Sequence, residues 1–82
     1  MTMTVSYQAV ECTYTDPLLG NYRAYAIVCR DLDGAQLALL DDFSADRAEA
    51  EAFAAQITAA DLDPIHLTDA ACDFLYLQYA VQ

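Results

Sequence analysis

The first half of the chain alternates apolar and polar residues in the way that β-strands do. Such alternation over residues 3–14, about 22–30 and about 35–41 predicts three strands, because successive side chains of a strand point to opposite faces. A Pro- and Gly-containing segment at 15–21 predicts a loop, and the Asp-Leu-Asp-Gly sequence at 31–34 predicts a tight hairpin. The second run is apolar on both faces, which is typical of a central strand.

The apolar positions of the first run change phase part-way along it. Val5 and Tyr7 share one face, whereas Val10 and Cys12 share the other. An extra residue in a strand shifts all later side chains to the opposite face, so this change predicts a β-bulge near Ala9–Val10.

The second half of the chain has helical periodicity, with helices expected at about 45–60 and 69–80. Ser44 and Thr68 are the expected N-caps, and Pro64 ends the first helix, with a short extended link after it. Phe53, Ile57 and Phe74 are expected to be buried. The apolar stripes contain Ala50, Phe53, Ala54, Ile57 and Ala60 in the first helix, and Ala70, Phe74, Leu77 and Val81 in the second.

These elements predict an α+β fold in the order β-β-β-α-α. A three-stranded antiparallel meander at about 3–41 is followed by two helices that pack on one face of the sheet. A chain of 82 residues has room for one domain, which we expect to span residues 1–82.

Charge restricts the classes of partner. The chain has 13 acidic residues against 3 basic ones, and its net charge is −10. Such a surface repels nucleic-acid phosphates and anionic membranes, so neither is an expected partner. The N-terminal residues 1–5 lack a secretory signal and no apolar run is long enough to span a bilayer, which predicts a cytoplasmic protein.

Candidate catalytic and metal-binding residues are few. His66 with Cys72 forms a conceivable acid–base and nucleophile pair, but we expect a packing role for both, and we expect buried, reduced cysteines. Asp41, Asp42 and Asp46 either converge on a divalent cation or cap the first helix, and both interpretations remain open. No phosphate-binding loop or catalytic motif occurs, so we expect neither a cofactor nor an enzyme.

The last helix predicts an interaction surface, because its apolar residues cover more than one stripe. Leu75, Tyr76 and Tyr79 are the candidate interface residues, and a homodimer or another protein is the expected partner. The leading hypothesis is thus a small, non-catalytic interaction or regulatory domain. The alternatives are an acidic decoy that imitates nucleic acid, and an aspartate-based metal protein or enzyme.

Four short motifs occur between residues 25 and 75: Tyr-Ala-Ile at 25–27, Phe-Ser-Ala-Asp-Arg at 43–47, Asp-Pro-Ile-His-Leu-Thr-Asp at 63–69 and Asp-Phe-Leu at 73–75. Together they resemble a family of small, uncharacterised proteins from gut-type Gram-positive bacteria. The likeness spans about residues 22–76, and the chain departs from the family by continuing past Leu75. The resemblance implies a bacterial cytosolic protein with a hairpin followed by helices, and it implies no activity.

Overall fold

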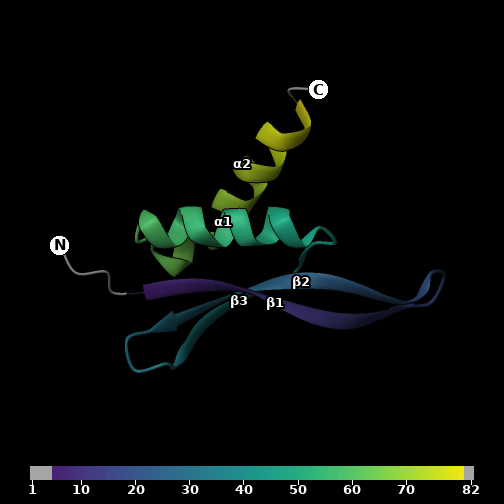
Figure 1. Ribbon diagram of the computed structural model, residues 1–82, viewed down its shortest axis with the longest axis horizontal. Coiled ribbons are helices and arrows are strands. Elements are labelled where there is room, and N and C mark those ends of the chain that lie inside the picture. Colours follow the sequence, from purple (N-terminus) through teal and green to yellow (C-terminus); the bar gives the residue numbers. More distant parts are fainter. Residues whose placement is uncertain (1–4, 81–82) are drawn as a thin grey trace.

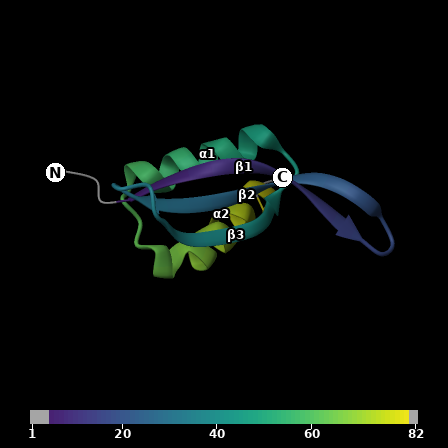
Figure 2. The ribbon, with the colours of Figure 1, turned by 90° about the horizontal axis from the view of Figure 1, so that it is seen from below.

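A computed structural model describes the backbone of residues 5–80 and the side chains of residues 5–77. Three strands form one antiparallel sheet in the order β1-β2-β3, and both helices lie on the same face of it (Figures 1 and 2). The predicted α+β fold and the central place of the second strand are confirmed. The elements are β1 (Val5–Asp16), β2 (Gly20–Asp31), β3 (Gln36–Ser44), α1 (Arg47–Ala59), the 3-10 turn η1 (Pro64–His66) and α2 (Leu67–Ala80).

The β1–β2 hairpin is longer than the rest of the sheet. Its pairing runs without a break from Val5 opposite Asp31 to Asp16 opposite Gly20, whereas β3 pairs with β2 only as far as Tyr25. The outer part of the hairpin therefore projects from the body as a two-stranded arm, which Figure 1 shows.

The predicted bulge in the first strand is wrong. β1 keeps a regular register throughout, and the two irregularities of the sheet lie between β2 and β3 instead. Near the body, Val5 and Tyr7 are buried on the helical face. Farther out, where the helices no longer cover the sheet, Val10 and Cys12 are half-buried on the opposite face. The apolar pattern changes because the covered face changes, and the strand itself stays regular.

The core lies between the helical face of the sheet and the inner sides of the two helices. Phe53 is 1% exposed, and its ring centroid lies 4.7 Å from that of Phe43 and 5.1 Å from that of Phe74. Ile27 and Cys29 of the central strand are fully buried in the same cluster. The expected burial of Phe53 and Ile57 is confirmed, but Phe74 is only half-buried at the edge of the cluster.

The first helix is capped by Asp46, so the expectation that Ser44 caps it is wrong. The Asp46 carboxylate accepts hydrogen bonds from the N–H groups of Ala48 at 2.9 Å and Glu49 at 3.3 Å. Ser44 instead ends β3, and its hydroxyl accepts the Asp46 N–H at 3.0 Å and donates to the Glu49 carboxylate at 2.7 Å. Hydrogen bonds of both Ser44 and Asp46 thus stabilise the junction between β3 and α1.

The second helix begins earlier than expected, and the segment before it is not extended. Asp63 caps the turn η1 by accepting the Ile65 N–H at 3.1 Å, and Pro64 occupies the first position, where its missing N–H does no harm. The turn continues directly into α2 at Leu67. Thr68 therefore lies inside the first turn of α2 and is not its cap.

Candidate functional site

Helix α2 is anchored at its start and leaves the body along its length (Figure 1). Leu67 and Ala71 are buried, and Leu75 is half-buried against the core. Tyr76 and Leu77 are then 71% and 61% exposed. Neither helix of the described chain is long and apolar enough to cross a membrane.

The predicted interface residues thus occupy different environments. Leu75 packs partly against the core, Tyr76 faces solvent, and the side chain of Tyr79 lies outside the described residues. Leu77, which shares an apolar stripe with Phe74, is exposed, because α2 diverges from the body along its length. Val81 of the same stripe also lies outside the described residues.

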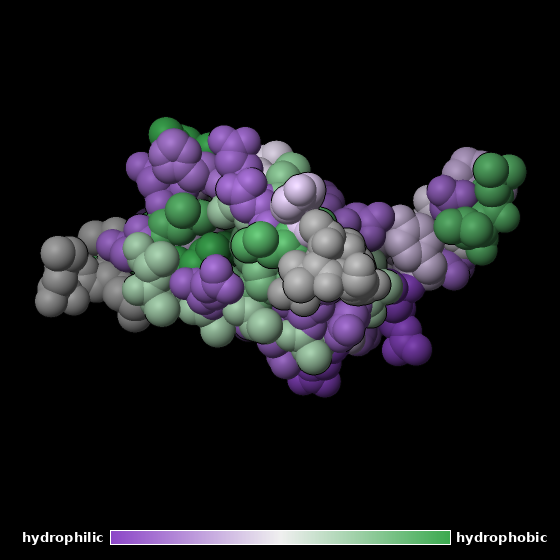
Figure 3. Space-filling view, turned by 90° about the horizontal axis from the view of Figure 1, so that it is seen from above, coloured by the Kyte–Doolittle hydropathy of each residue, from purple (hydrophilic) through white to green (hydrophobic). Residues whose placement is uncertain are grey.

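A groove of about 350 Å³ separates α1 from the diverging α2. Its apolar wall is formed by Phe53, Ile57 and Phe74, and Leu77 and Asp73 also line it. Viewed from the helical side, apolar side chains are visible on the surface of this face (Figure 3). The exposed end of α2 and this groove form a continuous surface, because Leu77 belongs to both.

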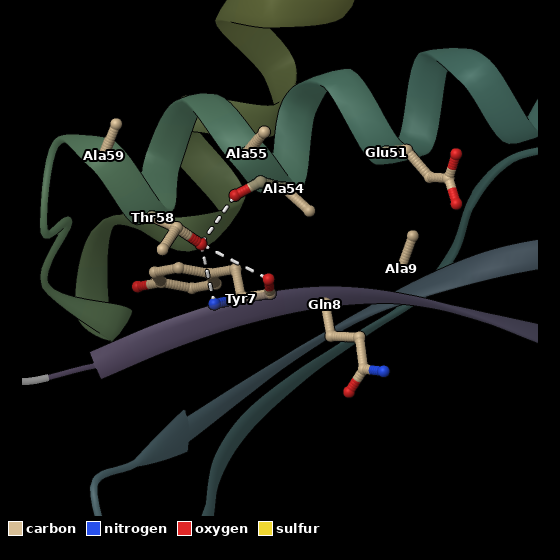
Figure 4. A pocket seen from close by; sticks show the side chains of 8 residues that line it. All are labelled: Tyr7, Gln8, Ala9, Glu51, Ala54, Ala55, Thr58 and Ala59. Atoms are coloured by element: carbon tan, nitrogen blue, oxygen red, sulfur yellow. Dashed lines mark hydrogen bonds between the residues drawn. The ribbon is translucent and has the colours of Figure 1, made fainter.

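A second groove, of about 680 Å³, runs between α1 and the outer edge of β1 (Figure 4). At one end of it the Thr58 hydroxyl accepts the Tyr7 N–H at 2.9 Å. The same hydroxyl lies 2.7 Å from the Ala54 carbonyl and 3.3 Å from the Tyr7 carbonyl, and can donate to either. Within residues 5–80 no other strand reaches this edge of β1, so Thr58 supplies the acceptor for the Tyr7 N–H.

The three candidate metal-binding aspartates each have another role. Asp41 accepts the Tyr14 hydroxyl at 3.0 Å, Asp42 accepts the Tyr22 hydroxyl at 2.6 Å, and Asp46 caps α1. Within residues 5–80, no three His, Cys, Asp or Glu side chains are grouped so that they could hold a metal ion. The aspartate pair of β3 instead binds the hairpin arm, in which Tyr14 lies opposite Tyr22 and the two rings stack at 5.6 Å.

The Tyr14 hydroxyl makes the stability of the fold depend on pH in the alkaline range. Burial raises the pKa of Tyr14 to about 12, and its hydrogen bond to Asp41 acts in the same direction, while the Asp42 N–H opposes it. The folded state therefore keeps a proton that the unfolded state loses near pH ~10. The contribution is complete below that pH and is lost as pH rises toward about 12.

We expect the free energy of unfolding to fall between about pH 10 and about pH 12, and to fall less steeply in Tyr14→Phe. Burial also raises the pKa of Tyr7, so the variant retains part of the slope. Urea unfolding at several pH values in this window measures both slopes. Equal slopes for the two proteins would show that Tyr14 does not titrate as described.

The other candidate chemistry is not assembled into a buried site. His66 is exposed in η1, and Cys72 is exposed on α2, so the expected burial of Cys72 is wrong. Cys29 is buried beside Tyr7, and burial raises the pKa of its thiol. All three cysteines are free, as expected.

The thiols should react in the order of their exposure. We expect a thiol reagent such as dithionitrobenzoate to modify Cys72 first, Cys12 more slowly, and Cys29 only after unfolding, because the buried thiol is neither accessible nor ionised. Mass spectrometry of peptides from a time course identifies each site. Modification of Cys29 at the rate of Cys72 in the folded protein would contradict this burial.

The tip of the hairpin arm carries an exposed apolar pair that sequence reasoning missed. Leu18 and Leu19 are 94% and 78% exposed, and the Asp16 carboxylate accepts both of their N–H groups at 2.7 and 2.9 Å. Apolar side chains accordingly end the arm in Figure 3. The signal in the sequence is two leucines between Pro17 and Gly20, a place where turns usually carry polar residues.

No family model, no curated protein and no solved structure matches this chain. The resemblance to small proteins of Gram-positive bacteria therefore stays a prediction.

Proposed function

We propose that this chain is a small, non-catalytic interaction domain that binds another protein, or a second copy of itself, through the outer part of α2. The observation that carries the proposal is the exposure of Tyr76 and Leu77 on α2, where Leu77 also lines the apolar groove between α1 and α2. A regulatory role in the bacterial cytoplasm is the setting that the acidic composition, the free thiols and the family resemblance favour together.

Burial of this surface would be favourable. Covering a side chain such as Leu77 contributes roughly 1.5–3 kcal/mol. Tyrosine is enriched at interfaces because its ring buries apolar area while its hydroxyl stays solvated, and Tyr76 is exposed on the same part of α2 as Leu77. A partner that inserts an apolar side chain between the helices would also cover the half-buried ring of Phe74.

The effect of salt on association distinguishes self-association from binding as an acidic decoy. Two copies that each carry a charge of −10 repel one another at low ionic strength, so self-association should strengthen as salt screens the charge. An acidic decoy bound to a basic protein would instead weaken steeply with added salt.

We expect sedimentation experiments to show a dimer whose population rises between low and moderate salt. Leu77→Asp should weaken this dimer by at least about tenfold, because it introduces a charge into the interface. Leu32→Asp is the matched control, since Leu32 is 74% exposed in the β2–β3 turn, away from α2. A wild-type monomer in both buffers at ~100 µM would remove self-association and leave a foreign partner.

A further inference from the structure

The outer edge of β1 has main-chain groups that nothing in the described chain pairs. Within residues 5–80, β1 is an edge strand that pairs only with β2, so alternate residues turn their N–H and C=O groups away from the sheet. The Thr58 hydroxyl accepts the N–H of Tyr7 and lies 3.3 Å from its carbonyl. The next two outward-facing residues, Ala9 and Glu11, have no main-chain hydrogen bond from another element within residues 5–80. An edge of this kind is a template for another strand.

Helix α1 leaves space beside this edge. The groove of about 680 Å³ is lined on the helical side by Ala54, Ala55 and Ala59, whose short side chains do not fill it. Figure 4 shows α1 above β1, with Thr58 pointing to the main chain of Tyr7 and with Ala9 farther along the same strand. A neighbouring strand lies about 4.8 Å from its partner, so it would enter the groove beneath the alanine flank of α1.

We propose that this groove binds an extended segment of a basic partner protein, which adds to the sheet as a fourth strand beside β1. The main chain of the segment pairs with the outward groups of Ala9 and Glu11. A side chain opposite Ala9 lies on the helical face and contacts Ala55. Strand addition of this kind draws affinity from main-chain hydrogen bonds and specificity from alternate side chains.

The charges near the groove favour a basic segment. Glu51 lines it, and the exposed side chain of Glu11 belongs to the next outward-facing residue. Each carboxylate has an arginine partner, Arg47 at 3.3 Å and Arg23 at 3.7 Å, but these ion pairs are exposed and contribute little. A lysine or arginine of the partner can compete for either carboxylate, and the net charge of −10 attracts such a segment from a distance.

A second copy of the chain does not fit the same edge at Ala9 in antiparallel pairing. Antiparallel pairing of two β1 strands would place an α1 helix of each copy on the same face, over strands only about 4.8 Å apart. Packed helices need about 8–10 Å between their axes, so the two helices would collide. Like charges would oppose the pairing as well.

Titration with a basic extended peptide, acetyl-Lys-Thr-Val-Thr-Val-Thr-Lys-amide, followed by amide NMR tests the proposal. We expect the Ala9 and Glu11 amide signals to move on binding, and their hydrogen exchange to slow because each N–H gains an acceptor. Replacing both lysines of the peptide by glutamate should weaken binding by at least about tenfold. Leu77→Asp should leave peptide binding unchanged, since Leu77 does not line this groove.

Two variants of α1 locate the peptide. Ala55→Phe fills the groove and should weaken binding by at least about tenfold, whereas Ala52→Phe, at an exposed position of the same helix outside the groove, should not. The proposal is overturned by the absence of any shift at Ala9 and Glu11 up to ~1 mM peptide, by shifts confined to α2, or by equal affinity of the two variants. A dimer that Ala55→Phe abolishes would likewise overturn it, because the occupant would then be a second copy.

Discussion

Replacement of Phe53 by alanine should lower the free energy of unfolding by about 3–5 kcal/mol, the range for a buried aromatic residue. Phe53 is 1% exposed and lies between the rings of Phe43 and Phe74, so its removal leaves a cavity that joins three elements. The aromatic contacts add to the area term, and both are lost together. Urea denaturation followed by circular dichroism measures the change.

Phe74→Ala and Leu32→Ala are the variants with which the loss of stability in Phe53→Ala is compared. Phe74 is half-buried at the edge of the cluster, so its truncation should cost less than that of Phe53. Leu32 is exposed, and its truncation should change stability by under about 0.5 kcal/mol. A loss at Phe53 no greater than that at Leu32 would mean that Phe53 is not at the centre of the core.

Replacement of Thr58 by valine should cost about 1–3 kcal/mol, although the two side chains have nearly the same shape. The hydroxyl of Thr58 accepts the Tyr7 N–H at 2.9 Å, and a methyl group cannot. The partly buried N–H is then left without a protein acceptor beneath α1. Urea unfolding measures the loss, and hydrogen exchange of the Tyr7 amide should accelerate.

Thr58→Ser is the matched control, because it keeps the hydroxyl and removes only a methyl group. It should retain the protection of the Tyr7 amide. If valine and serine at position 58 gave equal stability and equal exchange, the hydrogen bond between α1 and the edge of β1 would have no energetic role.

Local patterns in the sequence predicted the order of elements and the central strand. Alternation is a property of single strands, and an Asp-Gly turn at Asp33–Gly34 joins neighbouring ones, so both can be recognised without knowledge of the fold. The bulge predicted at Ala9–Val10 is wrong because the apolar pattern of β1 depends on more than the strand itself. Which face of β1 is covered depends on where β3 and the helices end, and those limits are set by distant parts of the chain.

For the candidate surfaces too, local patterns predicted the elements, whereas the position of each side chain depends on distant parts of the chain. Helical spacing correctly grouped Phe74 with Leu77, but it could not show that α2 leaves the body between them. Ser44 and Asp46 are both good caps, and the choice between them follows from the pairing of Ser44 with Tyr25 in the sheet. The alanines of α1 predicted a helix, whereas the groove beside β1 depends on which flank of that helix faces the edge strand.

The claim that the outer part of α2 is the binding surface is tested most directly by affinity capture with paired variants. The wild type, Tyr76→Asp/Leu77→Asp and Leu32→Asp/Ile65→Asp would be used as bait in lysate of the cells that make the protein. Tyr76, Leu77, Leu32 and Ile65 are all strongly exposed, so neither double variant should unfold the domain, and both add the same charge. We expect a protein, foreign or the chain itself, that is retained by the wild type and by the Leu32/Ile65 variant and lost from the Tyr76/Leu77 variant. Retention of the same proteins by all three baits would contradict it.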